Sequence, residues 1–301
     1  MSKQSKKTAK FTVGIPTYYG GPALVRAVKS ILKSKNVEDF RLIVCIDGNP
    51  LEPKIEKQLL DLGVEVVLSK KRGGQVARLK QLLSLSKTEL VVLTQDDIIF
   101  EPTTLKRLIE IFEKDEDVTL VSAKILPTKA HTFFEKIIEV GVKGNIRLGK
   151  LWRNGDNYLL ANGRCMVLRT KFMKKFTIFE EVINSDAYFY FENKKLGGKF
   201  VFADEAVVYN KSPQKLSEHL KQSRKFQISE KENTKYIESN LEHEYSIPLY
   251  LKVNALLREF INDPIHTFLY LGVNFYTKIA GKDLFKDVQR FWDTDLTTKR
   301  I

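Results

Sequence analysis

Two adjacent carboxylates, Asp96 and Asp97, follow an apolar run that is typical of a buried strand. Carboxylates at an exposed strand end suit a hard divalent cation, because Mg²⁺ is usually held by one or two such groups together with substrate phosphates. The same pair could instead cap the helix expected after Pro102. The pair alone leaves both roles open. Which of them is correct depends on the side chains at the ends of the neighbouring strands.

The charge of the whole chain also points to an anionic ligand. The 301 residues include 50 Lys and Arg against 37 Asp and Glu, a net charge of +13. This surplus predicts a nucleotide, a nucleic acid or an acidic membrane surface as partner. A hydrophobic fraction of 43% excludes a mainly disordered chain. Two cysteines and four scattered histidines argue against a disulfide scaffold and a zinc site.

Apolar runs and helical patterns alternate through the first half of the chain. They predict strands over 11–16, 41–47, 64–69 and 89–94, and helices over 24–32, 56–62, 76–85 and 102–112. Further strands are expected over 118–126, 164–168 and 199–202. The alternation predicts an α/β fold with a mainly parallel sheet flanked by helices, in which ligands bind at the carboxyl ends of the strands.

Two common nucleotide-binding motifs are absent after the first strand. The segment Thr17–Pro22 contains neither G-x-G-x-x-G nor G-x-x-x-x-G-K-[ST]. This absence argues against a dinucleotide-binding oxidoreductase and a P-loop NTPase.

The chain is expected to have three parts. A flexible basic tail covers 1–10, the α/β domain covers 11–230, and a helical extension covers 231–301. A charged helical pattern over 216–231 closes the domain. The first ten residues lack the apolar run of a secretory signal, which predicts a cytoplasmic location.

The most apolar late stretch, Pro264–Gly281, is interrupted by His266, Asn274 and Lys278. A bilayer span needs about 20 mostly apolar residues, so this segment is not expected to cross a membrane. It predicts either a buried or partner-facing helix, or one that lies in a membrane interface. In the second case the protein would sit peripherally on the cytoplasmic face of an anionic membrane.

Several short motifs, taken together, resemble those of the family 2 glycosyltransferases. They occur in the family's order and spacing: Pro16-Thr17-Tyr18, Ile46-Asp47-Gly48, Arg72-Gly73-Gly74-Gln75-Val76-Ala77-Arg78 and Gln95-Asp96-Asp97. The resemblance covers about residues 10 to 230. It implies a GT-A type, Rossmann-like catalytic domain that moves a sugar from a nucleotide-sugar to an acceptor hydroxyl with inversion.

The resemblance also implies roles for donor-site residues. Asp97 would bind Mn²⁺ or Mg²⁺ on the diphosphate of a UDP-sugar, and Asp96 would orient the ribose. The residues expected to hold the uridine end or the phosphates are Pro16, Thr17, Tyr18, Asp47 and Arg72. Two alternatives stay open: Asp47 as a turn aspartate before Gly48, and Arg72 as part of a solvated basic face.

Acceptor-side roles follow from the same resemblance. Gly163 begins a strand beside the acceptor, and Asp186 would be the general base, with Glu180 and Glu181 as rivals and helix capping as the alternative role. Gln222, Lys225 and Phe226 resemble the Q-x-x-R-W motif of processive polysaccharide synthases, where the basic residue would contact diphosphate and the aromatic ring the acceptor sugar. The acceptor would be a saccharide or a lipid-linked saccharide.

Two positions depart from the family pattern. Gln95 replaces the first acid of D-x-D, and Ser185 replaces the usual glutamate before the base. A nucleotide-sugar-binding protein with weak catalysis is therefore one alternative. A basic nucleic-acid-binding module is another, although no nucleic acid is expected because uncompensated carboxylates at a strand end repel phosphate.

Overall fold

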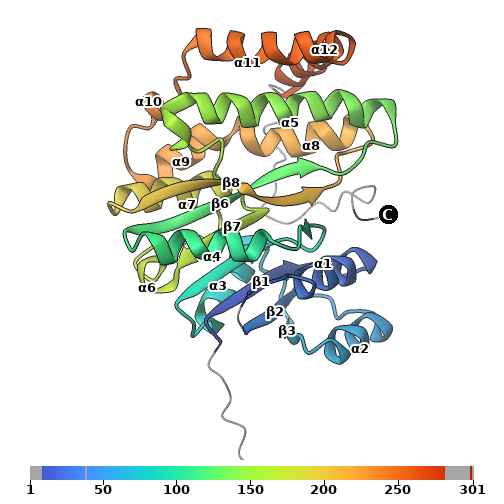
Figure 1. Cartoon of the computed structure of the whole chain (residues 1–301), viewed down its shortest axis with the longest axis vertical. Coiled ribbons are helices and arrows are strands. Elements are labelled where there is room, and N and C mark those ends of the chain that lie inside the picture. Colours follow the sequence, from blue (N-terminus) through green and yellow to red (C-terminus); the bar gives the residue numbers. More distant parts are fainter. Residues whose placement is uncertain (1–8, 38, 282–298, 300–301) are drawn as a thin grey trace, which may run out of the picture.

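The computed structural model describes residues 9–37, 39–281 and Lys299 (Figure 1). Most of the predicted basic tail over 1–10 lies outside the described residues. The N-terminal half alternates strands and helices, as its sequence predicts: β1 Phe11–Thr17, α1 Pro22–Leu32, β2 Phe40–Asp47, α2 Pro53–Asp61, β3 Glu65–Ser69, α3 Gln75–Leu85, β4 Leu90–Thr94, β5 Ile99–Phe100 and α4 Thr104–Lys114.

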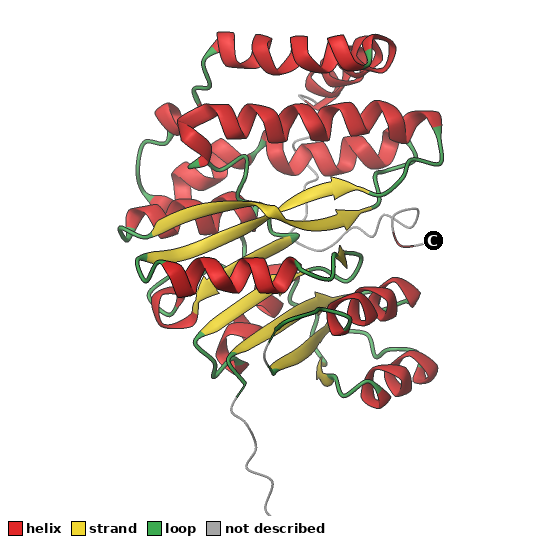
Figure 2. Cartoon of the chain, viewed as in Figure 1, coloured by secondary structure: helices red, strands yellow, loops and turns green. Residues whose placement is uncertain are grey.

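The second half begins with the remaining strands. Its elements are β6 Val118–Pro127, α5 Phe133–Leu151, the 3₁₀ turn η1 Trp152–Gly155, β7 Cys165–Arg169, α6 Thr170–Met173, α7 Ser185–Lys195 and β8 Lys199–Asn210. Within the described residues, the strands form one eight-stranded sheet in the order β3-β2-β1-β4-β7-β6-β8-β5, with helices on both faces (Figure 2).

The sheet is mixed. Strands β1 to β4 pair in parallel, and β6 pairs in parallel with β8. Between these two parallel groups, β7 runs antiparallel to both β4 and β6, and the two-residue strand β5 is antiparallel to β8. The prediction of a mainly parallel sheet flanked by helices therefore describes β1–β4 fully, while β7 reverses direction in the centre.

Both faces of the sheet are buried, which explains the near-continuous apolar strands. On β4, Val92 packs on the face covered by α1, α2 and α4, whereas Val91 and Leu93 pack on the face of α3 and α7. Because successive side chains of a strand point to opposite faces, one short apolar run contributes to two cores.

The 19-residue helix α5 was not predicted, because the sequence between 130 and 190 has the least regular pattern. A local signal was present, however: Thr132 and Glu135 form a capping box, in which the Thr132 side chain accepts from the Glu135 N–H and the Glu135 side chain accepts from the Thr132 N–H.

The C-terminal region is helical, as predicted, with α8 Leu216–Gln227, α9 Ser229–Ile237, α10 Glu242–Tyr245, α11 Leu249–Asn262 and α12 Pro264–Gly281. The single helix expected over 216–231 is instead two, since the chain turns at Ile228 between α8 and α9. Helices α11 and α12 pack against the outer side of α5, far from β1–β3 (Figure 1). In the described part of the chain, no helix is long and apolar enough to cross a bilayer.

Candidate active site

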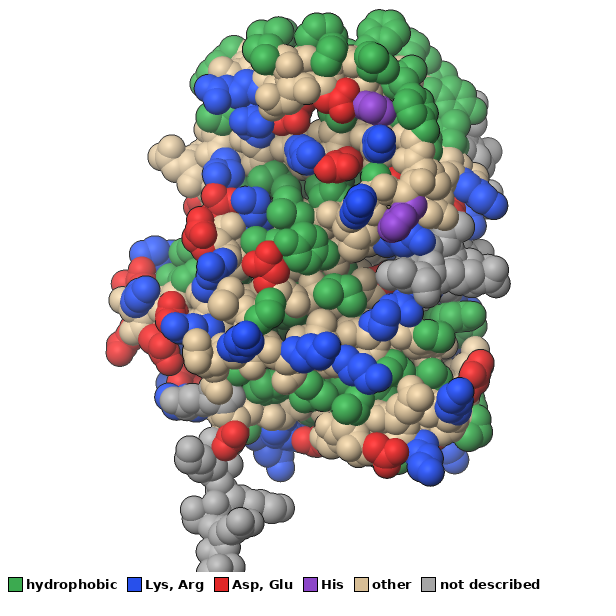
Figure 3. Space-filling model, turned by 45° about the vertical axis from the view of Figure 1, so that its right-hand side comes forward, with side chains coloured by type: hydrophobic (Ala, Val, Ile, Leu, Met, Phe, Trp, Pro, Cys, Tyr) green, Lys and Arg blue, Asp and Glu red, His purple; other side chains and the backbone are tan. Residues whose placement is uncertain are grey.

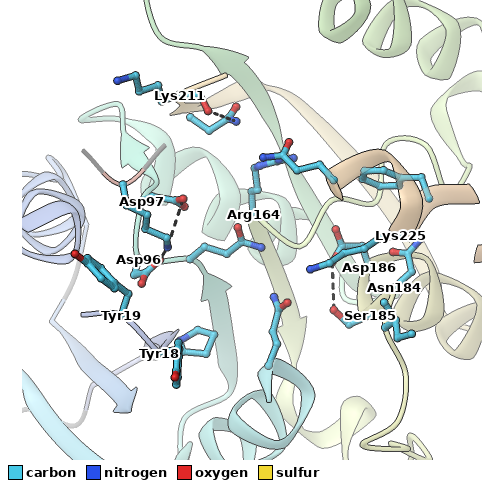
Figure 4. Close-up of a pocket in the computed structure, with 18 residues that line it drawn as sticks. Tyr18, Tyr19, Asp96, Asp97, Arg164, Asn184, Ser185, Asp186, Lys211 and Lys225 are labelled. Carbon is cyan, nitrogen blue, oxygen red and sulfur yellow. Dashed lines mark hydrogen bonds and ion pairs between the residues drawn. The ribbon is translucent and has the colours of Figure 1, made fainter. Parts of the chain in front are cut away.

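A cavity lies where the carboxyl ends of β1 and β4 meet the loop before α7 and the helix α8 (Figure 4). Polar and charged side chains dominate its lining: Pro16, Tyr18, Tyr19, Gln75, Gln95, Asp96, Asp97, Arg164, Ile183, Asn184, Ser185, Asp186, Asn210, Lys211, Gln222, Lys225, Phe226 and Lys299. In the close-up, Asp96 and Asp97 stand on one side, Asp186 on the other, and Arg164 between them.

Asp96 is fixed by the first strand. Its Oδ2 accepts a 2.6 Å hydrogen bond from the Thr17 hydroxyl, whose oxygen in turn accepts from the Gly20 N–H at 3.0 Å. Both Thr17 and Asp96 are buried. Thr17 is not among the residues that line the cavity, but it orients a carboxylate that is.

Lys299 lies against the aspartate pair. Its ammonium forms an ion pair and a hydrogen bond with Asp96 and lies 3.5 Å from Asp97 Oδ2. Burial raises the pKa of Asp97 above its usual range, and the nearby Asp96 carboxylate adds to this, although Lys299 and Arg164 oppose it. A cation is thus already present at the position where the sequence predicts a metal.

The donor set fits Mg²⁺ or Mn²⁺ only if a substrate completes it. Two adjacent carboxylates face the cavity, which matches ions that are bound by one or two carboxylates plus phosphate oxygens. Over the described ranges, no cluster of three or more Asp, Glu, His or Cys side chains could hold a metal without such help. Asp97 and Asp96 are the residues that could hold the ion.

Asp47 does not line the cavity. It is buried at the end of β2, where its two carboxylate oxygens accept hydrogen bonds from the Gly73 and Gly74 N–H groups at 2.7 and 2.9 Å. Arg78 Nε lies 3.3 Å from Asp47 Oδ1. The carboxylate thus fixes the loop that leads into α3.

Arg72 belongs to the same loop and is outside the cavity lining. Its guanidinium lies over the ring of Tyr18, 4.0 Å from the ring centroid, and Tyr18 faces the cavity. The loop held by Asp47 is therefore joined to the end of β1 through this stacked pair.

Asp186 lies in the first turn of α7 and faces the cavity. The Gly163 N–H hydrogen-bonds to its carboxylate, and the Ser185 hydroxyl donates to Oδ1 at 3.3 Å. A Cβ at position 163 would lie 2.0 Å from Oδ1, so only glycine leaves room for this carboxylate. Burial raises the pKa of Asp186, while the Gly163 amide, Arg164, Ser185 and Lys225 counteract part of the rise.

The two sides of the cavity are connected through the sheet. Thr94, directly before Gln95, pairs with Cys165 on the antiparallel strand β7. Its hydroxyl donates a 2.7 Å hydrogen bond to the Arg164 carbonyl. The aspartate pair and the Gly163–Arg164 segment are therefore held in a fixed register.

Helix α9 positions the segment before α7. Glu232 accepts hydrogen bonds from the Ile183 and Asn184 N–H groups at 2.7 and 2.9 Å, and Asn184 Nδ2 donates to Ser229 Oγ at 2.7 Å. Sequence reasoning missed Glu232, which lies in an unremarkable polar stretch. The boundary expected at residue 230 falls inside α9.

Most of the residues singled out from the sequence come together here. Eight line the cavity: Pro16, Tyr18, Asp96, Asp97, Asp186, Gln222, Lys225 and Phe226. Thr17, Asp47, Arg72 and Gly163 lie behind it. The rival bases Glu180 and Glu181 are not among the lining residues. Tyr19, Asn210, Lys211 and Lys299 line it without having been singled out. No local motif marks Lys299.

The mixed sheet, the carboxylates at its strand ends and the helical C-terminal region agree with the GT-A type fold expected from the sequence. The model of the family described as "Glycosyltransferase like family 2" matches residues 9–227. The chain belongs to this family and is a glycosyltransferase. No curated protein sequence matches it.

Solved structures share the fold. A mannosyltransferase, PcManGT from Pyrobaculum calidifontis, in complex with GDP-Man and Mn²⁺, superposes with a TM-score of 0.61 at 14% identity, over 93% of this chain and 84% of that one. Residues 1–349 of S. aureus TarS in complex with UDP give a TM-score of 0.55 at 16% identity, over 93% and 90% of the two chains. At these identities the likeness concerns the fold.

Proposed function

We propose that this glycosyltransferase transfers a sugar from a UDP-sugar to an acceptor hydroxyl with inversion at the anomeric carbon. One observation carries the proposal: a single cavity has the Asp96–Asp97 pair on one side and Asp186 on the other. An inverting displacement needs this division, because the leaving diphosphate and the acceptor's base are on opposite sides of the reacting carbon.

The donor would lie along the ends of β1 and β4. Pro16 and Tyr18 would contact the base, while Thr17 keeps Asp96 oriented for the ribose. Asp97 would hold Mn²⁺ or Mg²⁺, which when bound neutralises charge on the diphosphate. In our proposal Asp47 and Arg72 act indirectly, by fixing the loop that packs on Tyr18.

The base would be Asp186. Its carboxylate removes the proton from the acceptor hydroxyl as that oxygen forms its bond to the anomeric carbon and the bond to the diphosphate oxygen breaks. A raised pKa suits this task, since a stronger base accepts the proton more readily. Gly163 leaves the space and the N–H that keep the carboxylate in place.

Helix α8 would complete the acceptor side. Lys225 and Gln222 face the cavity and can contact diphosphate or sugar hydroxyls, and the exposed ring of Phe226 can pack on a saccharide. The acceptor we propose is a saccharide or a lipid-linked saccharide. Residues 11–230 would form the catalytic domain and 231–301 a helical extension. Helix α9 spans this boundary and holds the segment before the base.

Calorimetric titration tests the donor site. UDP, UDP-glucose, UDP-N-acetylglucosamine and GDP-mannose are titrated into the protein with and without Mn²⁺, and again into Asp97→Ala. We expect micromolar, metal-dependent binding of the uridine nucleotides that Asp97→Ala abolishes. Asp61→Ala, which removes an exposed carboxylate of α2, is the matched control and should bind like the wild type.

Other results would redirect the assignment. Tighter binding of GDP-mannose than of the UDP-sugars would make GDP-mannose the proposed donor and would leave the assignment as a glycosyltransferase unchanged. Binding that is indifferent to Mn²⁺ and to Asp97→Ala would overturn the metal role. Salt-dependent binding of oligonucleotides without nucleotide-sugar binding would favour the nucleic-acid module, and the anomeric configuration of the product, read by NMR, tests inversion.

A further inference from the structure

The helices α11 and α12 leave most of their large apolar side chains exposed. In α11 the buried side chains are Ala255 and Glu259, and in α12 Thr267 and Thr277 are buried. Glu259 is paired with Arg147 of α5 at 2.9 Å. A surface helix normally buries its apolar stripe and exposes its polar one. These two helices instead expose an apolar face to solvent.

The outer face of α11 carries large apolar side chains with exposed fractions of 45–78%: Leu249, Tyr250, Val253, Leu257, Phe260 and Ile261. The outer face of α12 continues it with exposed fractions of 38–70%: Ile265, Phe268, Leu271, Phe275, Tyr276 and Ile279. In α12, positions 265, 268, 275 and 279 fall on one helical stripe. We call these twelve exposed apolar side chains of α11 and α12 the apolar cap; it forms the green surface at the top of Figure 3.

The charges around this apolar cap are mainly basic. Lys252, Arg258 and Lys278 are exposed on the same two helices. Glu259 of α11 is paired with Arg147, and Asp263, between the two helices, is paired with His266. Beside the cap, a hollow between α5 and α11 of about 1020 Å³ is lined by seven basic side chains against four acidic ones.

We infer that the apolar cap formed by α11 and α12 docks on the surface of an anionic lipid bilayer. Aromatic and aliphatic side chains would enter the boundary between headgroups and acyl chains, while the lysines and arginines contact anionic headgroups. A second copy of the chain is a poorer occupant, because its own basic rim would face this one in a protein of net charge +13. The inference does not depend on the proposed donor or on catalysis.

Vesicle co-sedimentation without any nucleotide tests the docking. The wild type is spun with phosphatidylcholine vesicles and with vesicles containing phosphatidylglycerol. The cap variant is Ile265→Ser with Phe268→Ser and Phe275→Ser, all exposed side chains. Its matched control is Leu60→Ser with Leu68→Ser and Leu196→Ser, which are also apolar and exposed, by 38–56%, but lie outside the cap. Circular dichroism melting confirms that each variant is folded.

We expect the wild type and the control to sediment with the anionic vesicles, and the cap variant to bind at least tenfold more weakly. Lys252→Glu with Lys278→Glu should weaken binding to anionic vesicles only. Equal sedimentation with neutral vesicles would overturn the role of anionic lipid. A wild type that stays in the supernatant with both vesicle types would overturn the docking altogether; ultracentrifugation then distinguishes a dimer, in which a second copy covers the cap, from a monomer.

Discussion

Asp47 and Asp186 are both enclosed carboxylates, but the protein compensates their charges differently. Asp47 accepts from two backbone amides and lies 3.3 Å from Arg78, so both its oxygens are engaged within the protein. Asp186 has one backbone amide and one hydroxyl at 3.3 Å, and its pKa is raised. The first arrangement stabilises a loop, and the second leaves a carboxylate able to accept a proton.

The sharpest test of this contrast is Asp186→Asn. The amide cannot accept the acceptor's proton, so we expect the rate of sugar transfer to fall by about 10²- to 10⁴-fold, with UDP affinity unchanged. The measurement is steady-state transfer alongside UDP calorimetry. Asp61→Asn, on exposed α2, serves as control. A rate within a few-fold of the wild type would exclude Asp186 as the base.

The same residue gives a pH dependence with a definite sign. The base must be ionised, so transfer should decline as the pH falls through the raised pKa of Asp186. Because the folded-state pKa exceeds the unfolded one, the carboxyl favours folding when protonated, and this contribution is lost as the pH rises through the folded pKa. Asp186→Asn should therefore melt at a higher temperature than the wild type at neutral pH, and the difference should shrink in acid.

Asp47→Asn, unlike Asp186→Asn, should destabilise the folded protein. It removes the charge beside Arg78 and one of the two acceptors for the Gly73 and Gly74 amides. We expect the free energy of unfolding to decrease by about 3 kcal/mol, a value typical of breaking a buried pair, as measured by urea denaturation. If unfolding is unchanged and UDP binding is lost, Asp47 contacts the nucleotide directly and the contrast fails.

Lys299→Ala should have the smallest effect of these substitutions, and the effect should be on the Mn²⁺ concentration that nucleotide binding requires. Removing the ammonium next to Asp96 and Asp97 frees both carboxylates for a metal. We expect half-saturation of the nucleotide complex at a lower Mn²⁺ concentration than in the wild type, because the ion no longer has to displace the ammonium from the two carboxylates. Calorimetry against Lys57→Ala, an exposed lysine of α2, measures this. A higher Mn²⁺ requirement would show that Lys299 supports the site instead.

The sequence predicted the parts of the molecule that depend on short-range patterns. The strands β1–β4 and the carboxylates at their ends follow from apolar runs closed by polar residues. The helix α5 was missed because its inner face includes Gly141 and Glu135 and so weakens the apolar periodicity. The approach of Lys299 to Asp96, 203 residues earlier in the chain, depends on tertiary folding, and no local pattern encodes it.

The sequence also predicted a helix in the apolar stretch near the C-terminal end. Pro264–Gly281 is helical with the expected bounds. Whether its apolar residues are buried could not be read from composition, because the same residues would suit an inward or an outward face. In the structure the ring of Tyr270 packs directly over Gly141 of α5, so this face of α12 is inward and the opposite face is outward.

The hydrogen bond from Thr94 to the Arg164 carbonyl restricts how this enzyme could diverge. Because β4 and β7 are in register, inserting one residue in either strand would shift the segments bearing Asp97 and Gly163 by about 3.3 Å relative to each other. Such an insertion would uncouple the two halves of the cleft. New substrate preferences would therefore arise by changes in the loops before α7 and around α8, where length is not tied to the sheet.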